Sequence, residues 1–216
     1  MANDALGQIQ AFRTRVTKLN ANGVPSNGAD KSYVSNALVT LSTSPVYVDG
    51  EDFQEKNGEG VVCVNFQGPS TFRRIDWTLT ICTPDAYLME MLTGGTVLSD
   101  GDAVGYAYPA TGVLNPTNIS IEVWTKRVNS AGNLDDDLPY AWWVLPRCKD
   151  MRSGSKEFGN NSIKPQISGQ ATENLNWFDG PTNDWPVSSD RVLQYMPCVL
   201  ANVPDASTAY VTVAAS

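Results

Sequence analysis

The sequence predicts a mainly β protein in which one short α-helix packs against the sheet, and residues 60–95 carry the observations behind this prediction. Residues 73–81 place Ile75, Trp77 and Leu79 on one face and polar residues on the other, which is typical of a half-buried antiparallel strand. Residues 61–66 also alternate, which predicts a strand buried on at least one face. A short helical pattern follows, and the chain has no other convincing one.

The helix has clear boundaries in the sequence. Thr83 is the expected N-cap, Pro84 suits the first helical position, and Asp85 opposes the positive end of the helix dipole. Gly94 and Gly95 are expected to end the helix in the left-handed conformation. The residues expected to face the core are Tyr87, Leu88, Met91 and Leu92.

Further strands are expected along the rest of the chain. Residues 140–145 are apolar on both faces, which favours the middle of a sheet, whereas Pro165 suggests an edge strand or a strand start. Residues 1–8 are expected to be a mobile N-terminal arm and residues 20–31 a loop. The other predicted strands are 12–17, 38–41, 104–108, 119–126, 163–172, 192–200 and 209–213.

Residues 43–60 show no sustained period and are rich in Gly and acidic residues, so they are expected to form a long loop. The apolar residues within it have two interpretations: they pack back onto the body, or the loop becomes ordered only against a partner. The residues of this loop that a partner would contact are Tyr47, Val48, Asp49, Glu51, Asp52, Phe53, Glu55 and Glu59.

Composition limits the chemistry that is available. The chain has no histidine, which removes the commonest general base and metal ligand. Its four cysteines are widely spaced and are expected to be reduced core residues, although Cys63 and Cys82 lie in neighbouring predicted strands. No cofactor or metal is expected. No signal peptide and no apolar run long enough for a membrane anchor are visible, so synthesis in the cytoplasm is expected.

Charge is distributed unevenly along the chain, whose net charge is −8. Residues 1–34 have a net charge of +2, from four basic and two acidic residues, and residues 35–70 have −4, from one lysine and five acids. The acids of one copy could therefore meet the basic residues of another copy, or both sets could simply face solvent. The candidate basic residues are Arg13, Arg15, Lys18 and Lys31.

Two stretches carry a family resemblance. The order strand, strand, capped short helix and Gly-Gly over residues 60–95 resembles the major tail proteins (tail tube proteins) of long-tailed bacteriophages. The run Glu173-Asn174-Leu175-Asn176-Trp177-Phe178-Asp179-Gly180-Pro181, followed by Asn183-Asp184-Trp185-Pro186, is similar to a run found in many phages of actinobacteria. The resemblance implies a single tail tube domain over residues 1–216, folded as an antiparallel β-sandwich or half-barrel with a flanking helix.

The same resemblance implies a structural subunit of the virion tail. Six copies would form a ring, and rings would stack into a hollow tube through which DNA passes without specific binding, as an acidic chain allows. The implied partners are further copies of the chain, the tape measure protein, the tail terminator and the distal tail proteins.

Two other functions are compatible with parts of the sequence. Trp177 and Trp185 lie in a polar loop and could stack on sugars, as in a carbohydrate-binding β-sandwich, or could plug the barrel or contact a neighbouring subunit. A carboxylate pair such as Asp76 and Glu122 could serve a glycosidase, but no spacing specifies it and a non-enzymatic role is expected.

Overall fold

The computed structural model describes residues 7–108, 117–129, 131–154, 164–177, 191–207 and 209–213. It confirms a mainly β protein whose strand pairs are all antiparallel, with one α-helix among the described residues. The strands are β1 (Gly7–Lys18), β2 (Gly28–Ser35), β3 (Leu38–Val48), β4 (Asp52–Lys56), β5 (Val62–Gln67), β6 (Thr71–Ile81), β7 (Thr96–Asp100), β8 (Ala103–Ala107), β9 (Ile119–Val128), β10 (Tyr140–Ser153), β11 (Gln166–Ala171), β12 (Gln194–Cys198) and β13 (Val211–Val213).

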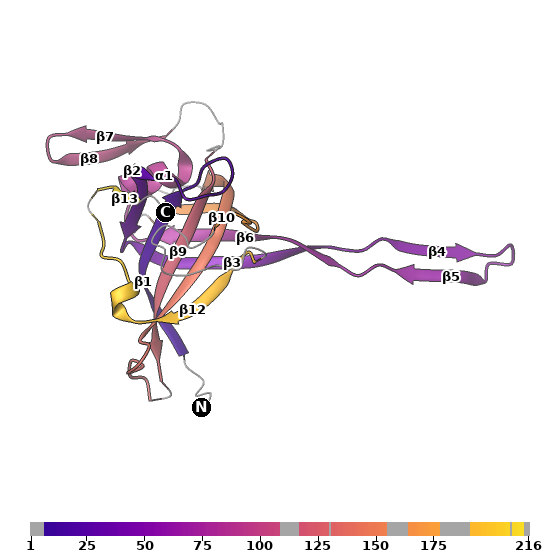
Figure 1. Cartoon of the computed structure of the whole chain (residues 1–216). Coiled ribbons are helices and arrows are strands. Elements are labelled where there is room, and N and C mark those ends of the chain that lie inside the picture. Colours follow the sequence, from indigo (N-terminus) through magenta and orange to yellow (C-terminus); the bar gives the residue numbers. More distant parts are fainter. Residues whose placement is uncertain are drawn as a thin grey trace.

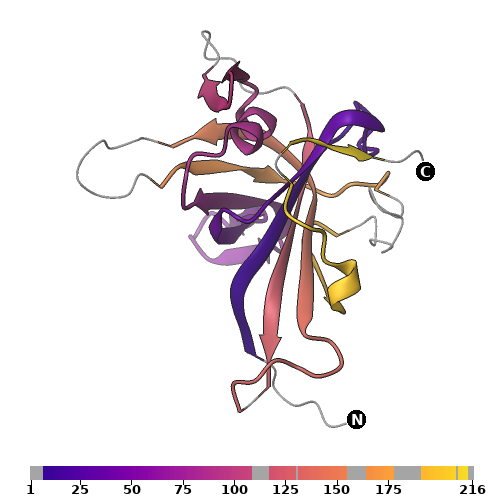
Figure 2. The same ribbon diagram turned by 90° about the vertical axis from the view of Figure 1, so that its left-hand side faces the viewer.

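Nine strands form one large sheet in the order β13-β2-β1-β9-β10-β11-β6-β3, with β12 paired to β10. The first half of β10, Tyr140 to Val144, pairs with both β9 and β12, whereas Cys148 to Ser153 pair with β11. This change of partner bends the sheet into two layers. Figure 2 shows β1, β9 and β10 side by side, and Figure 1 shows β3 and β6 lying across them.

The main core lies between the two layers and beneath the helix. It combines the alternating residues of β6, among them Trp77 and Leu79, with Ile121 of β9 and Leu88 of the helix, all of which are buried. A second apolar cluster, which includes Trp124, covers the other face of β9. Strand β9 is therefore buried on both faces. The expected central position of residues 140–145 is also confirmed, because this part of β10 lies between β9 and β12.

The helix α1 (Ala86–Thr93) begins two residues later than the sequence suggests. Its N-cap is Asp85, whose carboxylate accepts a hydrogen bond from the backbone N–H of Leu88 at 3.2 Å, so the assignment of Thr83 as N-cap is wrong. Asp85 also accepts hydrogen bonds from the hydroxyls of Tyr33 and Ser35, which hold the helix start against β2. Gly94 ends the helix at φ 75°, as predicted.

The prediction of a long loop over residues 43–60 is wrong, because residues 43–48 and 52–56 belong to strands. Residues 43–48 complete β3, which pairs with β6, and β4 pairs with β5 in a separate two-stranded ribbon. The expectation that residues 61–66 are buried is also wrong, because every residue of β5 is exposed. Part of the expected loop 20–31 likewise forms the start of β2.

Three turns that follow strands β1, β4 and β9 share an Asn-x-x-Gly pattern. Asn20, Asn57 and Asn129 each accept two backbone hydrogen bonds on the side-chain oxygen, and the glycine three residues later has φ between 81° and 87°. Such a side-chain bond imitates a backbone turn and reverses the chain within five residues. The turn at Asn57 therefore joins β4 to β5 as a hairpin.

Residues 1–6 of the expected N-terminal arm lie outside the described residues, and Gly7 and Gln8 begin β1. No helix in the described part of the chain is long and apolar enough to cross a membrane.

Candidate functional site

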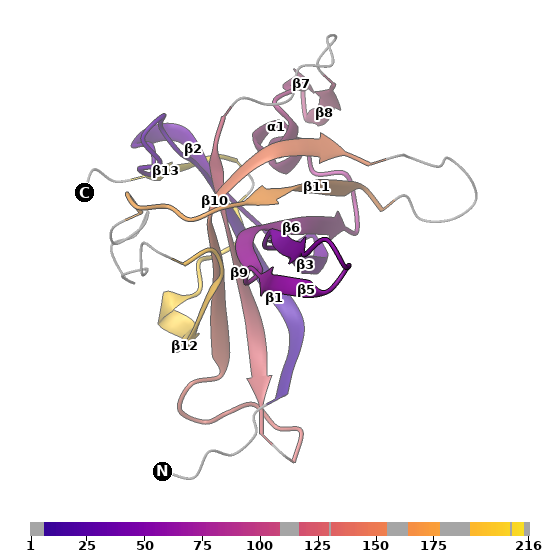
Figure 3. The ribbon, with the colours of Figure 1, turned by 90° about the vertical axis from the view of Figure 1, so that its right-hand side faces the viewer.

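A two-stranded ribbon projects far from the body of the protein (Figure 1), and Figure 3 views it from its tip. We call residues 49–70 the projecting ribbon: a neck formed by 49–51 and 68–70, the strands β4 and β5, and the turn at Asn57. Every side chain from residue 51 to residue 67 is exposed, so no part of the described body covers this segment. An isolated two-stranded hairpin is only marginally stable in water, so an exposed ribbon of this length needs an explanation.

The neck brings two glycines into contact. A Cβ at Gly50 would overlap the backbone carbonyl of Gly68, so no larger residue fits at position 50 with this geometry. The backbone N–H of Gly68 donates to the carbonyl of Glu51 at 3.1 Å, and the Ser70 hydroxyl donates to the Asp49 carboxylate at 3.1 Å. These contacts join the ribbon to the end of the β3–β6 pair, where Tyr47 packs edge-on against Phe72.

The two faces of the ribbon differ in polarity. Phe53 and Phe66 lie directly opposite each other, and Val64, which is paired with Glu55, extends their face toward the tip. The other face carries the polar pair Gln54 and Asn65. Phe53 and Phe66 are 55% and 58% exposed, and eight of the nineteen exposed large hydrophobic residues in the described part of the chain lie between residues 47 and 72. An apolar face of this kind is typical of a surface that binds another protein.

The eight residues expected to contact a partner all lie on or beside this ribbon. Tyr47 and Val48 end β3, Asp49 and Glu51 lie in the neck, and Glu59 lies in the tip turn. The remaining three, Asp52, Phe53 and Glu55, belong to β4. Sequence reasoning missed the apolar residues of the opposite strand, Val62, Val64 and Phe66. Their alternation is visible in the sequence, but it predicts a strand buried on at least one face, whereas the structure leaves the strand exposed.

The four candidate basic residues are not equally accessible. Arg15 is buried and binds Glu122 through two hydrogen bonds of 2.6 and 2.7 Å, so its assignment as a free partner for acids of another copy is wrong. Arg13 lies over the Phe12 ring, Lys18 lies near the Tyr210 ring, and both are partly exposed. Lys31 of β2 is also partly exposed.

The two carboxylates named as a possible glycosidase pair have separate structural partners. Glu122 is buried between Arg15 and the indole N–H of Trp142, which donates to it at 3.0 Å. Asp76 accepts a hydrogen bond from Arg74 at 2.7 Å at the surface. Among the described residues, no group of three Cys, Asp or Glu side chains gathers in a way that could hold a metal ion.

The tryptophans and cysteines are also placed differently from what the sequence suggests. Trp177 is buried in the second apolar cluster, so it offers no surface on which a sugar could stack. Trp185 lies outside the described residues. Cys148 and Cys198 are buried, as expected, but Cys63 and Cys82 are exposed, so the assignment of all four to the core is wrong.

Comparison with known proteins gives loose structural similarity only. No protein-family description and no curated protein matches the sequence. One similar solved chain comes from the "PVC sheath-tube complex in extended state" of an extracellular contractile injection system, with 14% identity, a TM-score of 0.32, and coverage of 76% of this chain and 87% of that chain. Another comes from the "anti-feeding prophage (AFP) baseplate, 6-fold symmetrised", with 13% identity, a TM-score of 0.30, and coverage of 89% and 97%.

Proposed function

We propose that residues 1–216 form one tail tube domain, a structural subunit of a long-tailed bacteriophage that assembles as hexameric rings stacked into a conduit for DNA. We further propose that the projecting ribbon makes the contact between successive rings. The observation that carries this proposal is the exposed apolar face of Phe53, Val64 and Phe66 on a segment that the described body leaves uncovered.

The energetics of the ribbon favour a partner of the same kind. Burying one phenylalanine side chain contributes about 1.5–3 kcal/mol, and a subunit that repeats along a tube supplies an identical partner for every ribbon. The acids of the ribbon would then meet Arg13, Lys18 and Lys31 of another copy. Because exposed charges are screened by salt, this part of the contact should weaken at high ionic strength.

The sheet itself is suited to a tube wall. Strands β6 and β11 place Trp77, Leu79 and Ile167 in the core. Their other face carries polar residues such as the partly exposed Thr78 and the exposed Ser168, a surface compatible with a water-filled lumen. Closure of neighbouring sheets around a ring would also cover the outer edge of β3, which pairs with no further strand in the described part of the chain and is a liability in an isolated subunit.

Removal of the ribbon tests the proposal. Val48 and Thr71 are paired, so residues 49–70 can be replaced by Asn-Gly, a two-residue turn that joins antiparallel strands. Circular dichroism should show a folded β protein, and electron microscopy should show no tubes under conditions in which the full chain forms them. Normal tubes from the shortened chain would refute the role of the ribbon.

A matched pair of variants tests whether assembly depends on the apolar side chains of the ribbon or only on its length. The Phe53→Thr/Phe66→Thr double variant removes the apolar pair, whereas Gln54→Thr/Asn65→Thr alters the next cross-strand pair on the opposite face. Threonine is favourable in strands, so both variants should keep the ribbon. The first should lose tubes and the second should keep them, and equal behaviour would show that the apolar face is not what binds.

The structure weakens the carbohydrate-binding alternative, because Trp177, one of the two tryptophans expected to stack on sugars, is buried. Sedimentation distinguishes the two functions: a stable monomer that binds polysaccharide would favour that alternative.

A further inference from the structure

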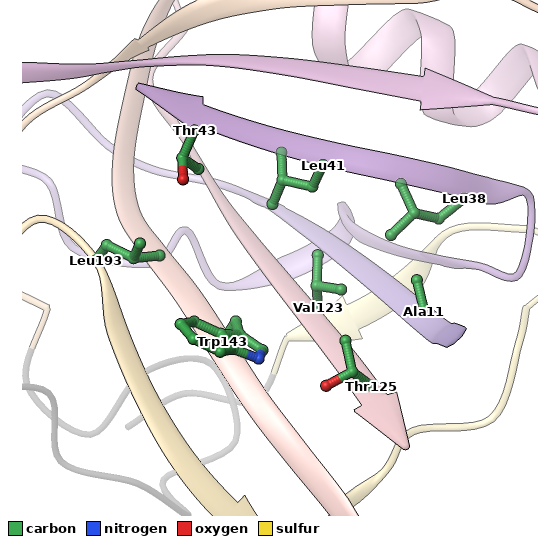
Figure 4. Close-up of a pocket in the computed structure, with 8 residues that line it drawn as sticks. All are labelled: Ala11, Leu38, Leu41, Thr43, Val123, Thr125, Trp143 and Leu193. Atoms are coloured by element: carbon green, nitrogen blue, oxygen red, sulfur yellow. The ribbon is translucent and has the colours of Figure 1, made fainter. Parts of the chain in front are cut away.

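An apolar groove lies between β3 and the layer that contains β9 and β10. Leu38, Leu41 and Thr43 of β3 form one side, and Val123 of β9 and Trp143 of β10 lie across from them (Figure 4). Its volume is about 270 Å³, and no charged side chain lines it. The groove lies where β3, the last strand of the sheet, passes over the other layer without pairing to it in the described part of the chain.

The groove cannot receive the ribbon of its own chain. Strand β3 lines the groove and continues directly toward the ribbon, and its residues from Leu38 to Val48 are paired with β6. Folding the ribbon back would break the neck contacts, among them the close approach of Gly50 to Gly68 and the hydrogen bond from the Gly68 N–H to the Glu51 carbonyl. Thr43 and Phe53 are ten residues apart, which corresponds to roughly 33 Å of extended strand. The apolar face and the groove of one chain are therefore held apart.

We propose that the Phe53–Phe66 pair of one copy inserts into this groove of a second copy. This inference rests on the proposed function and names the surface that receives the ribbon. A dry cavity of about 150 Å³ binds one benzene molecule, so a groove of about 270 Å³ has room for nearly two phenyl rings. Phe53 and Phe66 are opposite each other and would enter together.

This contact has a direction. In the proposed tube each copy gives its ribbon to one neighbour and accepts the ribbon of another, so the contact is head-to-tail and extends through the assembly. Equivalent points of two joined copies should lie roughly 33 Å apart along the ribbon, since Phe53 of one copy meets the position of Thr43 in the next.

Cysteine pairing tests the contact directly. In a Cys63→Ser/Cys82→Ser background, which removes the exposed thiols, a Val64→Cys chain is mixed with a Thr43→Cys chain under a mild oxidant. Val64 lies beside Phe66 on the apolar face, and Thr43 is an exposed residue of the groove. A disulfide forms readily only when the two Cα atoms come within about 7 Å, so mass spectrometry should find the Val64→Cys/Thr43→Cys link.

Ser168→Cys is the matched control, because Ser168 is exposed on the opposite, polar face of β11. Its link to Val64→Cys should be at least tenfold less abundant. Assemblies that require the ribbon but show no Thr43→Cys link, or an equal Ser168→Cys link, would overturn this inference and leave the proposed function standing. Absence of both links from a chain that sediments as a monomer would overturn both.

Discussion

Gly169 of β11 lies directly opposite Trp77 of β6, and a Cβ at position 169 would lie only 2.6 Å from Cζ2 of the indole. The absence of a side chain on one strand therefore provides the space in which the largest core residue of the neighbouring strand lies. Trp77 is almost completely buried, so this pair locks the register between β6 and β11.

We expect Gly169→Ala to destabilise the protein by about 1–3 kcal/mol, because the added methyl group must displace the Trp77 ring in a close-packed core. Urea unfolding measures the loss. Gly105→Ala in β8 is the control, since a Cβ there would meet no atom closer than 4.0 Å and the unfolding midpoint should hardly change. Equal midpoints for the two variants would contradict the contact.

The buried ion pair of Arg15 and Glu122 should be costly to break. Glu122→Gln keeps the size of the side chain but leaves the Arg15 charge in the interior without its carboxylate, so a loss of about 3–5 kcal/mol is expected. Thermal unfolding is the measurement. Asp76→Asn, which breaks the surface pair with Arg74, should leave the melting temperature unchanged, and a similar fall in both variants would argue against burial as the cause.

The neck of the ribbon should tolerate no side chain at position 50. Gly50→Ala should abolish tube formation, because the added methyl group collides with the Gly68 backbone. The melting temperature of the body should stay the same, because this contact lies outside the core. Electron microscopy and circular dichroism are the measurements. Gly58→Ala, at the tip of the ribbon where a Cβ meets nothing within 4 Å, should assemble normally, and tubes from both variants would contradict the role of the neck.

Stability should fall in alkaline solution. Burial, followed by the nearby Asp85 carboxylate, raises the pKa of Tyr33, and burial together with a hydrogen bond to Glu90 raises the pKa of Tyr210. Because the folded chain holds these protons more tightly than the unfolded chain, their contribution is complete below about pH 10 and is lost as pH rises above it. Urea midpoints between pH 8 and pH 11 should therefore fall less steeply for Tyr33→Phe/Tyr210→Phe than for the parent, and parallel curves would contradict the effect.

The thiols should react in two classes. Cys63 and Cys82 are exposed, whereas burial raises the pKa of the Cys148 thiol and raises that of Cys198 to about 11. Since the thiolate is the reacting form, a thiol reagent at pH 8 should modify two cysteines quickly and the other two only after unfolding. Four equally fast thiols would contradict the burial of Cys148 and Cys198.

Local patterns predicted much of the body correctly. The alternation around Trp77, the left-handed Gly94 and the two-sided apolar run at 140–145 depend on neighbours along the chain, and all three were confirmed. The helix start was misplaced by two residues because Thr83 and Asp85 are both good capping residues. Asp85 is held in place by Tyr33 and Ser35, which are distant in sequence.

The sequence by itself determined which strands have one apolar face, where the short helix ends, and that residues 43–60 carry acidic residues beside Tyr47 and Phe53. Only the tertiary structure decided what covers each face. Val62, Val64 and Phe66 alternate much as Ile75, Trp77 and Leu79 do, yet the first set is exposed and the second is buried. The physical reason is that alternation reports the polarity of a face, whereas burial depends on a second layer brought there by long-range pairing, and the described body ends before the ribbon begins.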